Sequence, residues 1–452
     1  MVKDLTEGKV RPVLWGFTIP MFISVVFQQL YNIADSALAG RFAGEQALAA
    51  VGASYPITMI FMAIAVGCNV GCAVVISSYF GAGDIRRMKT AISTTLIAST
   101  VLAILLTILG LILSPYLMKM MNTPDNIFHA GDLYLKIYIG GMVFLFCYNV
   151  ATGIFTALGD SKTPLYFLIG SSVGNVILDY IFVAVFRFGV SGVAWATFIA
   201  QGIAGILAVT TLLKRVAKLP AGHGKVMLYS KSMLRRIAKI AIPSILQQSF
   251  VSIGNIFIQS LVNSYGSAVI AGYSAAVKLN TFTITSFSTL GNALSSFSAQ
   301  NIGAGKISRV KQGFRAGGVL AWLTAIPFFI LFFFMGKSML QIFMENPTGE
   351  AMKTGMEFLK IVSPFYFVIS LKLLADGLLR GSSAMIGFMV STFTDLILRV
   401  ILAYIFADFF GSTGIWMSWP VGWSISAIIS LLFYRYTLKK LTLERRLYHD
   451  KD

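Results

Sequence analysis

The sequence predicts an all-α polytopic membrane protein with twelve transmembrane helices in two pseudo-symmetric six-helix lobes. The first observation is composition: the 452 residues are 56% hydrophobic and only 12% charged, whereas charged residues make up about 25% of a typical soluble domain. The second is that apolar runs long enough to cross a bilayer, about 20 residues each, recur from end to end. The third is an internal repeat.

Twelve apolar runs have membrane-spanning length, and no loop between them is long enough for a separate soluble domain. We expect an amino-terminal lobe at 1–213, a basic cytoplasmic linker at 214–239, a second lobe at 240–435 and a cytoplasmic tail at 436–452. The expected spans are 13–40, 50–80, 89–117, 133–158, 164–187, 190–213, 240–264, 268–300, 314–336, 357–379, 385–406 and 412–435.

The repeat appears when the sequence is shifted by 222 residues against itself. Gly81-Ala82-Gly83 then falls on Gly303-Ala304-Gly305, and Phe188-Gly189 falls on Phe410-Gly411. These glycines mark helix ends, where glycine tolerates a left-handed backbone. An even number of helices per lobe gives both lobes the same orientation, so we expect a parallel repeat about an axis along the membrane normal.

The charge distribution predicts a lipid bilayer as the partner, and it argues against nucleic acid. The net charge is +18, but most Lys and Arg lie in alternate loops and in the two terminal segments. By the positive-inside rule these face the cytoplasm, together with both termini. Cys68, Cys72 and Cys147 fall within spans and have no metal-ligand spacing, so we assign them no disulfide or metal role.

Polar residues interrupt the first span. Gln28, Asn32 and Asp35 lie in its second half. An ionisable group at bilayer depth costs at least ~2.5 kcal/mol on insertion scales and usually marks an ion or substrate pathway. Asp35 is therefore the first candidate for a functional site.

A second acid lies in the fifth span. Asn175 and Asp179 are four residues apart and share one helix face, and Thr197 on the sixth span offers a further oxygen. No Lys or Arg lies deep in a first-lobe span, so Asp35 and Asp179 need a shared proton or a bound cation. The alternative is that each Asp only caps a kink or bonds a neighbouring hydroxyl.

The second lobe carries cations as well as acids. Lys372 with Asp376, and Asp395 with Arg399, each have the i, i+4 spacing of a self-neutralising pair, and we interpret Asp395–Arg399 as a structural pair. We expect the coupling chemistry in the first lobe. The candidates for a substrate cavity are Gln28, Tyr31, Asn32, Tyr55, Met59, Lys278 and Asp376.

Taken together, these features resemble the multidrug and toxic compound extrusion (MATE) family over about residues 5–440. The resemblance rests on Asp35 after Gln28-Gln29-Leu30-Tyr31-Asn32, Asn175 with Asp179, Thr197, the Gly-Ala-Gly turns and Ala157-Leu158-Gly159-Asp160-Ser161-Lys162-Thr163-Pro164. It implies two six-helix bundles that open alternately to each side of the membrane. It also implies that Asp35, Asn175, Asp179 and Thr197 form the proton or sodium site. This chain lacks the acid that some members carry on the seventh helix.

The resulting hypothesis is an antiporter that exports organic, cationic or amphiphilic compounds in exchange for protons or sodium. We expect a monomer in the plasma (inner) membrane that needs no cofactor. A flippase for a lipid-linked or other amphiphilic substrate is the nearest alternative, and a passive channel is another. An enzyme is not expected, because no hydrolase motif is present and all three His lie outside the spans.

Overall fold

A computed structural model describes residues 3–38, 42, 45–121, 123–220, 225–344 and 349–449, and the side chains at 33–38, 45–48 and 445–449 lie outside that description. Within these ranges every regular element is helical. The chain forms two compact units. One comprises Met1–Asp4 and Ile23–Ile245, and the other comprises Leu5–Phe22 and Leu246–Asp452.

Two long helices are divided between the units. α1 (Val10–Leu38) and α8 (Lys231–Asn263) each contribute their first part to one unit and their second part to the other. Both boundaries fall shortly after a proline inside the helix, Pro20 in α1 and Pro243 in α8. A proline within a helix lacks the N–H for an i→i−4 hydrogen bond and permits bending. The expected boundaries, by contrast, kept each of these helices in one lobe.

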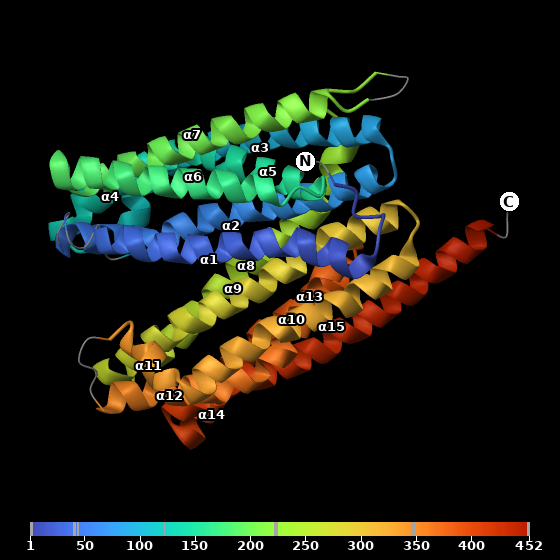
Figure 1. Ribbon diagram of the computed structural model, residues 1–452. Coiled ribbons are helices and arrows are strands. Elements are labelled where there is room, and N and C mark those ends of the chain that lie inside the picture. Colours follow the sequence, from blue (N-terminus) through green and yellow to red (C-terminus); the bar gives the residue numbers. More distant parts are fainter. Residues whose placement is uncertain are drawn as a thin grey trace. The chain divides into compact units, whose positions relative to one another are not determined.

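The remaining helices of the first unit run along one another (Figure 1), with α5 packed between α2, α3 and α7. They are α2 (Glu45–Gly81), α3 (Ile85–Met120), α4 (Asp125–Gly140), α5 (Met142–Ala157), α6 (Lys162–Asp179) with the π-helix η2 (Tyr180–Val185), and α7 (Val190–Ala217).

In the second unit, α13 packs against α9 and α15, and α14 packs along α15. The helices are α9 (Ser267–Gly303), α10 (Ile307–Phe334), α11 (Gly336–Gln341), α12 (Gly349–Val362), the 3₁₀ turn η3 (Ser363–Phe365), α13 (Tyr366–Gly381), α14 (Met385–Phe410) and α15 (Ser412–His449).

The expected spans correspond to these helices. Ten of the described helical segments are long and apolar enough to cross a membrane, or eleven if the bent pair α4–α5 counts as one span. That pair bends by 47°, at Gly140-Gly141. The 37-residue helix α9, which is rich in Ser, Thr and Asn, occupies the place of the remaining expected span.

The linker was expected to reach residue 239, but α8 already begins at Lys231, because Met233, Ile237 and Ile240 bury one helical face.

Small residues let the helices approach closely. A Cβ atom at Gly71 of α2 would lie 2.7 Å from the Cβ of Ala241 in α8, and one at Gly377 of α13 would lie 2.0 Å from the carbonyl oxygen of Gly291 in α9. Membrane helices lack a hydrophobic driving force between them, so such close backbone packing supplies much of their association.

Candidate functional site

The first unit joins α1 to α6 through a side-chain hydrogen bond. The Tyr31 hydroxyl donates to the Asn175 Oδ1 atom across 144 positions of sequence. The contact depends on the fold and not on local sequence. It brings the polar second half of α1 against the helix that carries the second acid.

α6 presents a buried polar face at this contact. Ser172, Asn175 and Asp179 follow one another at helical spacing, with only 5%, 2% and 2% of their surfaces exposed. The Nδ2 atom of Asn175 has no hydrogen-bond partner among the described residues. Sequence reasoning identified Asn175 and Asp179 but missed Ser172, although its i−3 spacing from Asn175 places it on the same face.

The helix changes form directly after Asp179. Residues Tyr180–Val185 adopt the π-helix η2, a rare conformation that often occurs at functional sites. The following helix α7 packs tightly against it: a Cβ atom at Gly192 would lie 3.1 Å from the Val183 side chain. Asp179 is therefore the last residue of the regular α-helix, directly before a π-helix that packs against α7.

Asp35 lies in α1, but its side chain is outside the described part of the structure. Its backbone position can still be compared with α6. α1 and α6 are the first and fifth spans and consecutive spans alternate in direction, so both helices run the same way. Asp35 follows Tyr31, and Asp179 follows Asn175, by four residues or ~6 Å of helix. Each acidic position therefore lies about one helical turn beyond the residue that joins α1 to α6.

The fourth predicted member of the site is less closely connected. Thr197 is half-buried on α7, which packs against α6. No hydrogen bond joins its hydroxyl to Asn175 or Asp179 among the described side chains. The structure thus brings Tyr31 and Asn175 into contact and leaves Thr197 on the adjacent helix.

The other first-unit candidates are mostly exposed. Gln28, Asn32 and Tyr55 are exposed, and Met59 is half-buried. Tyr31 was expected to line a substrate cavity, and in the structure its hydroxyl is held by Asn175. A further ion pair, which sequence reasoning did not single out, joins Asp132 to Lys136 at 2.6 Å.

The second unit contains a buried ion pair. The Lys372 Nζ atom lies 2.7 Å from the Asp376 Oδ2 atom, and both side chains are almost fully buried. The hydroxyls of Ser391 and Ser430 donate to the other oxygen of Asp376 at 3.0 and 2.5 Å. Asp376 is therefore bound on both oxygens inside the unit. Lys278, in contrast, is exposed, with Nζ 5.8 Å from the ring centroid of Phe343.

The expected ion pair between Asp395 and Arg399 is not formed in the structure. No oxygen of Asp395 lies within 4.0 Å of a guanidinium nitrogen among the described ion pairs. The Arg399 guanidinium instead stacks 4.5 Å from the ring centroid of Trp419 on α15. Both side chains are 6% exposed, and Asp395 Oδ1 has no hydrogen-bond partner among the described residues. Sequence spacing places two residues on one face but does not fix their rotamers.

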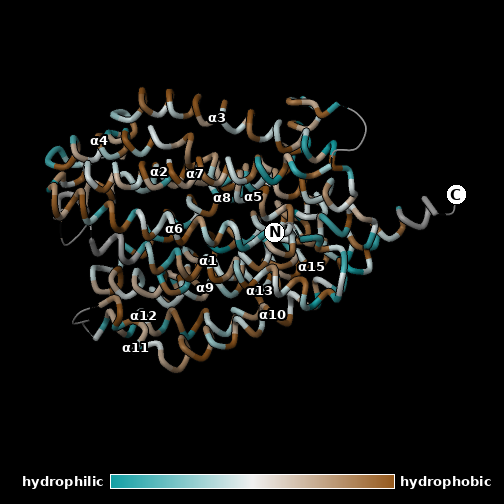
Figure 2. The backbone as a smooth tube through the Cα atoms, turned by 45° about the horizontal axis from the view of Figure 1, so that its top comes forward, coloured by the Kyte–Doolittle hydropathy of each residue, from teal (hydrophilic) through white to brown (hydrophobic). Residues whose placement is uncertain are grey.

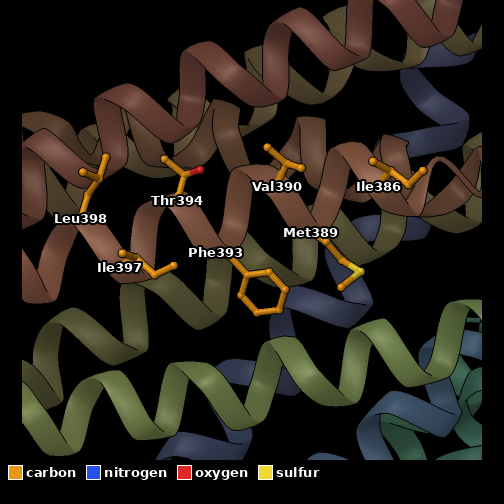
Figure 3. Close-up of a pocket in the computed structure, with 7 residues that line it drawn as sticks. All are labelled: Ile386, Met389, Val390, Phe393, Thr394, Ile397 and Leu398. Atoms are coloured by element: carbon orange, nitrogen blue, oxygen red, sulfur yellow. The ribbon is translucent and has the colours of Figure 1, made fainter.

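An apolar groove of about 610 Å³ runs along α14. In Figure 3, Phe393 and Met389 point to one side of the helix, whereas Thr394 and Val390 point to the other. None of the candidate cavity residues lines this groove. Its lining residues are Ile386, Met389, Val390, Phe393, Thr394, Ile397 and Leu398.

The fold and its buried polar residues define a class: a polytopic α-helical membrane transporter built from an internal repeat. The sequence profile of the MatE family matches twice, at residues 20–181 and 243–405. The chain therefore belongs to the MatE family, whose members are transporters and not enzymes. The two matches begin at 20 and 243, which agrees with the repeat predicted from the glycine landmarks.

Similar proteins match almost over their full length. The "Probable multidrug resistance protein YpnP" of Bacillus subtilis is 30% identical over 96% of each chain. The multidrug export protein MepA of Staphylococcus haemolyticus is 23% identical over 97% of this chain and 96% of its own. The solved outward-facing structure of a multidrug resistance MATE transporter has a TM-score of 0.90 at 22% identity, covering 97% of this chain and 98% of that one. It shows the fold, and twelve helices are the architecture of this family.

Proposed function

We propose that this protein is an antiporter that exports organic, cationic or amphiphilic compounds, driven by inward movement of protons or sodium through Asp35, Asn175, Asp179 and Thr197. The observation that supports this most directly is the Tyr31–Asn175 hydrogen bond. It ties the acidic half of α1 to the buried polar face of α6. The names of the relatives, multidrug resistance and multidrug export proteins, support the substrate class.

The proposed chemistry follows from two acids in membrane spans, of which Asp179 is buried. Two carboxylates that come close together in a low-dielectric environment repel each other, so one holds a proton or both share a cation. Carboxylate, amide and hydroxyl oxygens are ligands that suit a hard cation such as sodium. The same residues suit proton binding, so the choice of ion needs measurement.

The proposed transport cycle depends on how the binding of ion and drug shifts the balance between the two conformations of the transporter. A ligand shifts a conformational equilibrium only by its difference in affinity for the two states. In the proposed cycle, the ion neutralises Asp35 and Asp179 from outside and favours release of the drug. The ion then leaves to the cytoplasm, and the freed carboxylates restore high affinity for the next substrate. We place both termini in the cytoplasm and the protein, as a monomer, in the inner membrane.

The test is efflux from proteoliposomes with separately imposed proton and sodium gradients. We expect one gradient to drive efflux of a fluorescent organic cation by the wild type. Asp35→Asn should abolish gradient-driven efflux, because an amide neither binds a proton nor carries charge, and Asn175→Ala should reduce it strongly.

The matched control is Asp408→Asn, which removes an exposed carboxylate at the end of α14. It should transport like the wild type. Normal gradient-driven efflux by Asp35→Asn would show that the coupling site lies elsewhere. An absence of efflux of any organic cation under both gradients would contradict the substrate class. Flavin nucleotides are then the next substrates to test, because a 23% identical relative is an FAD transporter.

A further inference from the structure

The chain before α8 is held against the beginning of α3. The backbone N–H groups of Met227 and Ser230 donate to the hydroxyls of Thr90 and Thr94 at 3.3 and 3.0 Å. The Ser93 hydroxyl donates to the carbonyl oxygen of Met227 at 3.2 Å. These hydrogen bonds fix the position of an extended segment beside the first turns of α3.

The docked segment carries an exposed apolar run. Val226, Met227, Leu228 and Tyr229 are 36%, 58%, 76% and 46% exposed. Removing apolar side chains such as these from water is favourable. A contiguous exposed apolar patch on a protein typically marks an interaction site. Hydrogen bonds to α3 fix the backbone, while the described part of the protein leaves these side chains partly exposed.

The position of the run indicates what covers it. One turn beyond Thr94, about 4.5 Å along the helix, α3 begins an exposed apolar face at Ile97, which continues through Val101 and Leu105. Hydrophobic residues predominate along this helix in Figure 2. Because α3 is long and apolar enough to cross a membrane, we expect this face to meet lipid. The docked segment therefore lies at the level where α3 enters the hydrocarbon, in the headgroup layer.

Cations flank the apolar run. Lys225 and Lys231 stand at its two ends, and Arg86 lies in the first turn of α3. All three are exposed, and none takes part in an ion pair among the described residues. An apolar run with tyrosine and with cations on both sides matches the interface of a bilayer, where aromatic rings and basic residues meet headgroups.

We propose that residues 225–231, together with the start of α3, form a binding surface for anionic phospholipids. Leu228 and its apolar neighbours enter the upper acyl region. Lys225, Lys231 and Arg86 contact the phosphodiester and the negatively charged headgroup. This surface lies outside the proposed ion site, and it would anchor the beginning of α8 to the membrane surface.

The test uses the full chain in nanodiscs, with the variant Leu228→Trp as the reporter. Lipids brominated on the upper acyl chain quench a nearby indole. We expect brominated phosphatidylglycerol to quench the added fluorescence, measured as the difference from the parent protein. It should do so at a lower mole fraction than brominated phosphatidylcholine. Lys225→Gln and Lys231→Gln should each raise the mole fraction for half-quenching about fivefold, because a cation near the surface contributes about 1 kcal/mol.

The matched control removes two other cations, with Lys439→Gln and Lys440→Gln in the exposed part of α15. It should leave the half-quenching point unchanged. If neither lipid quenches the added indole, the run lies in water, which overturns the proposal and leaves a soluble partner as the occupant to seek. Equal quenching by both lipids, or an equal shift in the control, would overturn the selectivity for anionic headgroups.

Discussion

At the scale of single residues, local spacing predicted which side chains share a helix face. Asn175 and Asp179 share one face of α6, as their i, i+4 spacing predicts, and both are buried. Lys372 and Asp376, with the same spacing, form an ion pair. The same spacing was wrong for Asp395 and Arg399, because an aromatic face on α15 competes for the guanidinium. The partner of Asn175 could not be predicted, since Tyr31 reaches it only through the tertiary fold.

Asp160 lies in the turn between α5 and α6, outside the spans, and its carboxylate has several partners. Its carboxylate accepts the N–H groups of Lys162 and Thr163 at 3.2 and 3.0 Å in the first turn of α6. It also accepts the Thr163 hydroxyl at 2.7 Å and forms an ion pair with Arg215 of α7. Burial opposes the charged form, but the hydrogen bonds from Thr163 and Arg215 hold the pKa of Asp160 below its usual value.

We expect Asp160→Asn to lower the stability of the protein by about 1–3 kcal/mol at neutral pH, because buried donors lose a charged acceptor. A carboxylate whose folded pKa lies below its unfolded value stabilises the fold above the unfolded pKa. That contribution disappears as the pH falls through the folded pKa. Thermal unfolding in detergent should therefore show a difference from the wild type that is constant above about pH 5 and shrinks below about pH 4. A difference that grows in acid would contradict this account.

At the scale of the helices, the structure adds close packing that hydropathy does not reveal. The sequence predicted where α2 and α8 lie, but it did not predict that Gly71 faces Ala241. Gly67, one turn earlier on α2, meets Ile245 of α8 in the same way. The glycine spacing was visible in the sequence, yet its partner helix was not.

We expect Gly71→Ala to destabilise the first unit by about 1–3 kcal/mol, the usual cost of overpacking. The added Cβ would lie 2.9 Å from the Ala241 backbone nitrogen, and a helix backbone cannot yield easily. The matched control is Gly52→Ala on the same helix, where no atom lies within 4 Å. Gly52→Ala should be neutral or slightly stabilising because alanine favours a helix. Equal apparent melting temperatures for the two variants would refute the packing argument.

At the scale of the whole molecule, the repeat and the spans were the most secure predictions. The family profile matches each half separately, and the solved MATE structures share the fold over nearly the full chain. Both features could be predicted because apolar runs of spanning length and a 222-residue repeat are visible in the sequence itself. The division of α1 and α8 between units was not predictable in this way, since it depends on which distant side chains pack together.

The charge pattern makes a prediction about topology. An even number of spans, with basic residues near both ends, should place the amino and carboxyl termini on the cytoplasmic side. Epitope tags at the two termini should therefore both resist protease in intact cells and both be cleaved after the membrane is opened. Cleavage of only one tag in intact cells would require an odd number of spans.

The divided helices also have a consequence for how the protein is made. The first unit includes the early part of α8, which the ribosome delivers only after the linker. The second unit includes the beginning of α1, among the first residues to emerge. The first unit has all of its residues once Ile245 has been delivered, whereas Leu5–Phe22 of the second unit must wait for partners that begin only at Leu246. The beginning of α1 is therefore among the first parts of the chain to be made and among the last to complete its packing.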